Sequence, residues 1–166
     1  MEWNTQEMNG RFNKSNHLDR KDMIMFPILE NLNPAKKKTL NHYWAFNLNI
    51  KDQRFEVLDS WRTLDDVDLD TNARKIAATI RTMWDHHYHK SHIVLDDFSL
   101  VNIDVPKQNN DIDCGIYGLT NTSKWDARAV PKYEPDDIPN IRKQLTNTWV
   151  SSVHNKALWK DILKLP

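Results

Sequence analysis

Two neighbouring runs rich in aromatic and β-branched residues constrain the fold most strongly. HYWAFNLNI (42–50) and RFEVLDSW (54–61) are separated by only the three residues KDQ. Runs of this composition favour strands, and so short a connection predicts an antiparallel hairpin. His42 then begins the first strand and Asp59 ends the second. Because those two ends meet at one edge of a hairpin, we expect the imidazole and the carboxylate to lie close together.

A long amphipathic helix is predicted next, in LDTNARKIAATIRTMWDHHYHK (69–90). Asp70 and Thr71 are candidates for its N-cap. Its apolar residues recur at helical spacing and form one face: Ala73, Ile76, Ala77, Ile80, Met83 and Trp84.

Shorter apolar segments predict further strands. MIMFPIL (23–29) is typical of an edge or entering strand that stops at Pro27. HIVLDDFSLVNIDVP (92–106) predicts one or two strands that end at Pro106. Residues 1–22 are rich in Asn and charge without periodicity, and we expect a loose polar arm there.

The last third of the chain predicts two helices. One opens at Cys114, and the other runs from Ile138 to about Trp149, with Leu158 as its furthest end and Pro139 in its first turn. The order of strands, helix, strand, helix, helix indicates the α+β class. With 166 residues and seven tryptophans, the chain suffices for one core of ordinary size, so we expect a single domain over residues 23–166.

Charge and cysteine content narrow the classes of function. The chain has 23 basic and 23 acidic residues, so no global field favours nucleic acid or an anionic membrane. No stretch approaches the length of apolar residues that spans a bilayer, and the N-terminus does not resemble a signal peptide. A single cysteine excludes an internal disulfide and favours a reducing compartment. We expect a monomer in the nucleus or cytoplasm, without nucleic-acid or membrane partners.

The one cysteine lies in a setting unlike that of a buried filler. VPKQNNDIDCGIYGL (105–119) surrounds Cys114 with polar residues and places it where a helix begins. A helix N-terminus and a nearby imidazolium both favour the thiolate. His42 is the candidate base and Asp59 the group that orients it. The Cys114 backbone N–H and the Gln108 side-chain amide are candidate donors to an oxyanion, and Gly115 permits close approach of another backbone.

Three segments taken in order resemble the signature motifs of the ubiquitin-like-protein-specific cysteine proteases, the SUMO or sentrin-protease family. NHYWAFNLNI contains the histidine that begins a strand. RFEVLDSW contains the aspartate that ends the next strand, in an Asp-Ser pair. VPKQNNDIDCGIYGL contains a glutamine six residues before the cysteine of Asp-Cys-Gly. The resemblance covers about residues 23–155. The plant and plant-transposon branches are most similar, through FEVLDS and IPNIRKQLTNTWVSSVHNK.

This resemblance implies a papain-like α+β fold in the permuted His-Asp-Cys order, with a mixed central sheet flanked by helices. It implies a peptidase or isopeptidase in which Cys114 attacks the carbonyl after the Gly-Gly end of a ubiquitin-like modifier. His42, Asp59 and Gln108 complete the catalytic set, and Tyr43 and Gly115 line the substrate channel. It also implies a modifier or its conjugate as partner, and no cofactor. The chain departs from the family pattern in its N-terminal region, which we expect to be shortened because barely 22 residues precede the first predicted strand.

Other interpretations stay open at the level of sequence. Cys114 alone is also consistent with a buried thiol. A catalytically weak or inactive domain derived from the family would only bind a ubiquitin-like protein or another partner; the polar composition of the segment after Cys114 favours this alternative. The cluster WDHHYHKSH suggests a metal site, but no cysteine or carboxylate pattern completes four ligands, so we expect none.

Overall fold

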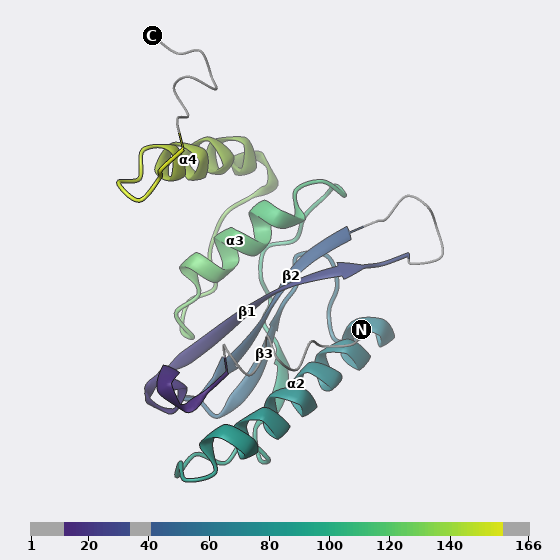
Figure 1. The fold of residues 1–166 in the computed structure, drawn as a ribbon. Helices are drawn as coiled ribbons and strands as arrows, with labels where there is room; N and C mark the ends of the chain where they lie inside the picture. The colour runs from purple at the N-terminus through teal and green to yellow at the C-terminus, as the bar shows by residue number, and fades with distance from the viewer. Residues whose placement is uncertain (1–11, 34–40, 158–166) are drawn as a thin grey trace. The chain divides into compact units, whose positions relative to one another are not determined.

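A computed structural model of the chain describes residues 12–33 and 41–157 (Figure 1). The chain divides into two compact units, Met1–Lys132 and Tyr133–Pro166. The second unit falls within the span 23–166 that the sequence predicts as one domain.

Four strands of the first unit form one sheet in the order β1-β2-β3-β4. Their bounds are β1 (Met23–Asn31), β2 (Asn41–Asn49), β3 (Arg54–Leu58) and β4 (Ser99–Asn102). β1 and β3 flank β2 in antiparallel pairs, whereas β4 runs parallel to β3, so the sheet is mixed as predicted. The predicted hairpin is confirmed, with Asn49 opposite Arg54.

β1 corrects one prediction, because the strand does not stop at Pro27. It continues to Asn31, and Pro27 lies opposite Ala45 of β2. β1 is an edge strand, and an edge tolerates a proline because the missing N–H can face away from the ladder. Between His92 and Pro106 the structure has a single strand, β4, which is shorter than the apolar segment that predicted it.

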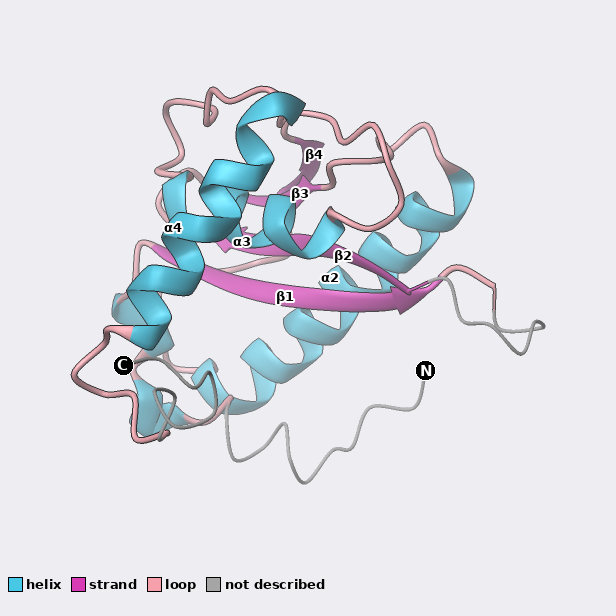
Figure 2. Cartoon of the chain, turned by 90° about the horizontal axis from the view of Figure 1, so that it is seen from above, coloured by secondary structure: helices cyan, strands magenta, loops and turns pink. Residues whose placement is uncertain are grey.

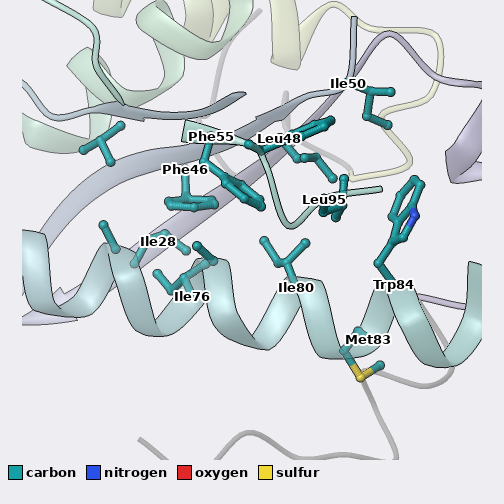
Figure 3. Packing of buried hydrophobic residues seen from close by; sticks show 14 of the residues in the cluster. Ile28, Phe46, Leu48, Ile50, Phe55, Ile76, Ile80, Met83, Trp84 and Leu95 are labelled. Atoms are coloured by element: carbon teal, nitrogen blue, oxygen red, sulfur yellow. The ribbon is translucent and has the colours of Figure 1, made fainter. Parts of the chain in front are cut away.

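The core of the first unit lies between the sheet and α2 (Val67–Tyr88). The Asp66 side chain caps this helix by accepting from Leu69 N, so the cap lies four residues before the predicted Asp70. All six apolar positions predicted for the helix face are buried. In Figure 3, Ile76 and Ile80 of α2 point toward the sheet and lie in the same cluster as side chains on the facing side of the sheet. The labelled sheet residues are Ile28, Phe46, Leu48 and Phe55.

Residues 12–20 do not form the loose arm that the sequence predicted. They make two 3-10 turns, Lys14–Asn16 and Leu18–Arg20. Phe12 is buried and packs edge-on against Trp84 of α2, at 6.3 Å between ring centroids. The Tyr88 hydroxyl donates to Asn13 O at 2.6 Å. One buried aromatic therefore anchors a polar segment that lacks any periodic signal, while residues 1–11 lie outside the described part of the chain.

The opposite face of the sheet carries α3 (Cys114–Lys124). Figure 1 shows α2 and α3 on opposite sides of the sheet, and Figure 2, seen from above, shows β1 passing in front of α2. On this face Glu56 of β3 is fully buried and accepts four hydrogen bonds. The donors are Asn47 Nδ2, Asn49 Nδ2, Arg54 Nε and Trp125 Nε1. Trp125 directly follows α3, so this network ties the end of the helix to the sheet.

The second unit contains a 3-10 turn, Pro135–Asp137, followed by α4 (Ile138–Val150). Pro139 lies in the first turn as predicted, where its missing N–H costs no hydrogen bond. The helix ends at Val150, so it does not continue toward Leu158. Within the described residues, no helix has the length and apolar character needed to cross a bilayer.

Candidate active site

The hairpin brings together the histidine and the aspartate that the sequence paired. His42 lies at the start of β2, and Asp59 directly follows β3. The His42 Nε2–H donates to Asp59 Oδ1 at 2.7 Å, and both side chains are fully buried. Because an ionised carboxylate can only accept, this bond assigns the proton of the neutral ring to Nε2.

The other ring nitrogen of His42 is consequently an acceptor with a free lone pair. Nδ1 is buried and has no hydrogen-bond partner among the described residues. A buried polar atom without a partner is costly, and such atoms often mark functional sites. Trp61 packs edge-on against the imidazole, with 5.6 Å between the ring centroids, while its own side chain is half-exposed. Trp61 and Asp59 thus hold the ring in place, and Nδ1 remains available to accept a proton.

Asp59 is kept ionised by its surroundings. Burial opposes the charged carboxylate, but the hydrogen bond and charge of His42 and the backbone N–H groups of Trp61 and Arg62 outweigh burial and hold the pKa of Asp59 below its usual value. Those two N–H groups both donate to Oδ1, at 2.7 and 3.1 Å. The carboxylate therefore remains an acceptor for the imidazole throughout the neutral pH range.

Cys114 is the first residue of α3, as predicted, and lies beside the start of β2. Its Sγ donates weakly to the Asn41 carbonyl oxygen at 3.9 Å. Since a carbonyl oxygen and the next Cα lie less than about 3 Å apart in a planar peptide, the sulfur is within about 7 Å of the His42 Cα. The N–H of a first helical residue has no acceptor within the helix and is available to a substrate.

Gln108 is fixed by the residue that follows Asp59. The Ser60 hydroxyl donates to Gln108 Oε1 at 2.6 Å, and Gln108 N donates to Ser60 O at 2.8 Å. The amide nitrogen Nε2 donates to Asn110 O at 2.6 Å. An amide nitrogen carries two hydrogens, so one remains for a developing oxyanion.

The loop between Gln108 and Cys114 is organised by Asn110. Its Oδ1 accepts from the backbone N–H groups of Ile112 and Asp113, both at 3.0 Å. Its Nδ2 donates to the Asp113 carboxylate at 2.8 Å. This loop leads directly into α3, so a fixed turn connects Gln108 to Cys114.

Tyr43 and Gly115 lie against each other beside Cys114. A Cβ placed on Gly115 would meet Tyr43 Cδ2 at 3.7 Å, which is ordinary van der Waals contact. The Tyr43 side chain is nonetheless 43% exposed. The two residues predicted to line a channel therefore adjoin the nucleophile, and the tyrosine keeps a surface that a substrate can contact.

Several residues of this site were missed by sequence reasoning. They are Glu30, Ser60, Trp61, Arg62 and Lys107, whose Nζ donates to the backbone carbonyls of Asp59 and Arg62 at 2.9 and 3.0 Å. Ser60, Trp61 and Arg62 follow Asp59 directly, so their position was a usable signal. Glu30 lies opposite His42 in the pairing of β1 with β2. That register cannot be read from a strand whose end was predicted at Pro27.

The histidine cluster lies apart from these residues, at the end of α2 and in the following turn. His86 and His87 contact each other edge-on, with ring centroids 4.6 Å apart. Over residues 12–33 and 41–157, no group of three or more His, Cys, Asp or Glu side chains is placed to hold a metal ion.

Comparison with known proteins identifies the family to which these motifs point. Residues 3–150 match the family model described as the Ulp1 protease family, C-terminal catalytic domain. Ubiquitin-like-specific protease 1 of Saccharomyces cerevisiae is 28% identical over 133 residues, which are 78% of this chain and 19% of that protein. The chain thus spans about a fifth of the length of this curated relative.

Solved structures of the same family share the fold. The C-terminal Ulp1 protease domain in complex with Smt3, the yeast ortholog of SUMO, is similar with a TM-score of 0.57 and 23% identity, over 87% of this chain and 57% of that one. The SUMO protease Ulp1 with its catalytic cysteine oxidised to a sulfenic acid gives 0.60 and 24%, over 86% and 59%. This likeness confirms the predicted α+β protease fold.

Proposed function

The chain belongs to the Ulp1 protease family, and on this premise we propose that it is a cysteine-type peptidase or isopeptidase that cleaves after the C-terminal Gly-Gly of a SUMO-type modifier. The observation that carries the proposal is the arrangement at His42. Its Nε2 is engaged by Asp59 at 2.7 Å, its Nδ1 is free of partners among the described residues, and Cys114 begins a helix beside it.

The chemistry follows from these atoms. Nδ1 of His42 takes the proton of the Cys114 thiol, and the resulting thiolate attacks the carbonyl carbon of the second glycine. The oxyanion that forms accepts hydrogen bonds from the Cys114 N–H and from Gln108 Nε2. The imidazolium then protonates the leaving amine as the C–N bond breaks, which leaves a thioester on Cys114. Water deprotonated by Nδ1 hydrolyses that thioester and restores the thiol.

A SUMO-type modifier is favoured as substrate by two observations. The solved relative with a bound modifier holds Smt3, the yeast ortholog of SUMO. In this chain the side chain beside the nucleophile is the half-exposed ring of Tyr43, packed against Gly115. A flat aromatic ring next to a glycine leaves room for a narrow peptide without side chains, and a Gly-Gly tail is such a peptide. A nuclear or cytoplasmic location, a monomeric state and the plant branch stay predictions.

Hydrolysis of a modifier precursor tests the proposal. Purified chain is incubated with a SUMO precursor that carries a C-terminal extension after Gly-Gly, and the products are identified by mass spectrometry. We expect cleavage directly after the second glycine by the wild type and none by Cys114→Ala. Ubiquitin and NEDD-type precursors are run in parallel to define the modifier. Binding of the modifier without cleavage of any precursor would instead support the binding-only alternative.

A further inference from the structure

A buried pair of opposite charges, Arg62 and Glu30, adjoins Asp59 on the side of the carboxylate that does not face His42. Oδ2 of Asp59, the oxygen that does not face His42, accepts from Arg62 Nε at 3.1 Å. The terminal nitrogen of the same guanidinium donates to Glu30 Oε2 at 2.7 Å. The side chains of Arg62 and Glu30 are only 10% and 12% exposed. The two carboxylates therefore hold the guanidinium from both sides.

Besides Arg62, two other side chains of the first unit hold Glu30 in place. Trp44 Nε1 of β2 donates to Oε2 at 3.0 Å, and Asn72 Nδ2 of α2 donates to Oε1 at 2.8 Å. Glu30 belongs to β1 and lies directly opposite His42 in the strand register. The network around Glu30 thus connects β1, β2, α2 and the segment after β3 next to His42.

Stability alone is a poor explanation for this arrangement. Moving two charges out of water costs free energy, and apolar replacement of a buried ion pair is often neutral or stabilising. Burial opposes the charge of Arg62, and the hydrogen bonds and charges of Glu30 and Asp59 outweigh it and raise the pKa of the guanidinium. Arg62 and Asp59 therefore stay charged at neutral pH, adjacent to an imidazole that must change its charge during the reaction.

We propose that Arg62 and Glu30 are positioning residues for the proposed protease reaction: Arg62 holds Asp59 so that Oδ1 faces His42, and Glu30 balances the charge that Arg62 brings to the imidazole. This role rests on the proposed function. Arg62 acts through Asp59 and touches neither the nucleophile nor, by its burial, the substrate.

Two effects of opposite electrical sign follow. The positive charge of Arg62 disfavours the imidazolium, whereas the negative charge of Glu30 favours it. Removing either charge therefore changes the balance between imidazole and imidazolium in an opposite direction. The charged or titratable groups connected to the ring by these contacts are Asp59, Arg62, Glu30, Lys107 and Cys114, and Asp104 acts on Lys107 in turn.

Kinetics of precursor cleavage test the positioning role. We expect Arg62→Gln to lower kcat about ten- to a hundredfold with little change in KM, because a charge-assisted hydrogen bond to Asp59 is lost. Arg62→Lys keeps the charge but not the planar fork, so it should recover only part of kcat. Arg74→Gln is the matched control, since Arg74 forms an exposed ion pair on α2 with Asp70. Wild-type kcat in Arg62→Gln would overturn the proposal.

A second measurement is independent of activity. NMR of histidine-labelled protein, with the His42 signal assigned through His42→Gln, follows the titration of the imidazole. We expect its midpoint to rise in Arg62→Gln and to fall in Glu30→Gln. Equal shifts in one direction, or none in either variant, would overturn the charge-balancing role even if the wild type cleaves SUMO precursors.

The double variant Glu30→Gln/Arg62→Gln limits loss of folding, because it removes the buried charges of Glu30 and Arg62 together, while the Asp59 carboxylate keeps its hydrogen bonds from His42 and from the backbone N–H groups of residues 61 and 62. We expect its imidazole to titrate close to the wild type while its kcat stays as low as that of Arg62→Gln. A double variant with wild-type kcat would contradict the proposal. If instead the proposed protease function is wrong, the wild type cleaves no precursor, while the His42 signal still shifts in opposite directions in Arg62→Gln and Glu30→Gln.

Discussion

The hydroxyl of Ser60 donates to Oε1 of Gln108 at 2.6 Å. Ser60 directly follows Asp59, so one short segment after β3 contacts both the proposed base, His42, and the proposed oxyanion donor, Gln108. The backbone reinforces this connection, since Gln108 N donates to Ser60 O at 2.8 Å. His42 and Gln108, the proposed base and oxyanion donor, are therefore fixed relative to each other through the adjacent residues Asp59 and Ser60.

This connection predicts non-additive effects on catalysis. Gln108→Ala removes one oxyanion donor and should lower kcat about a hundredfold. Ser60→Ala should lower kcat less, because the amide is only released from its orientation. In the Gln108→Ala background, Ser60→Ala should have little further effect, which a double-mutant cycle of single-turnover rates would reveal. Additive losses would show that Ser60 acts by another route.

The ionised Asp59 predicts a pH-dependent contribution to stability. Its pKa is lowered in the folded state, so its stabilisation is fully present above the unfolded value of about 3.9 and is lost as pH falls through the folded value. Asp59→Asn should therefore destabilise by about 1.5–3 kcal/mol at pH 7, and this difference should shrink at pH 3. Urea denaturation of both proteins at both pH values gives the comparison. A difference independent of pH would contradict the assignment.

Glu56 should be essential to the other face of the sheet. Glu56→Ala leaves buried donors without an acceptor, and we expect a loss of about 3–5 kcal/mol. Asp70→Ala is the matched control, because Asp70 pairs with the exposed Arg74 and should cost less than about 1 kcal/mol. Chemical denaturation measures both. Similar losses in the two variants would mean that the network around Glu56 contributes little.

The glycines of α3 predict a stabilising substitution. A Cβ on Gly118 would meet Tyr43 Cβ at 3.8 Å, and no described glycine has a positive φ. Gly118→Ala should therefore stabilise by about 0.5–1 kcal/mol, the difference in helix propensity. Gly115→Ala should give a similar gain but lower kcat/KM, because it adds bulk beside Cys114. Thermal denaturation and precursor cleavage separate the two; destabilisation by Gly118→Ala would contradict the geometry.

Local patterns predicted the elements that carry the nucleophile, base and orienting acid. The short KDQ connection fixes the strand pairing, and periodic apolar residues define α2, so both were visible in the sequence. The start of α3 at Cys114 was likewise marked by its polar loop. These features depend on neighbours along the chain.

Features that depend on distant contacts were missed. Burial of Phe12 against α2 comes from a single aromatic in a polar segment. β1 continues past Pro27 only because it lies at an edge, which the sequence does not reveal. The pairing of Arg62 with Glu30 requires the register of β1 on β2, and a strand ended at Pro27 would have excluded Glu30.

Covalent capture tests the central claim most directly. A SUMO-type modifier with a C-terminal electrophile in place of its last carbonyl is incubated with the chain, and the adduct is mapped by mass spectrometry. The account predicts a single adduct at Cys114, absent in Cys114→Ala and strongly slowed in His42→Ala. An adduct that persists in Cys114→Ala, or a wild type that binds the modifier without reacting, would contradict it.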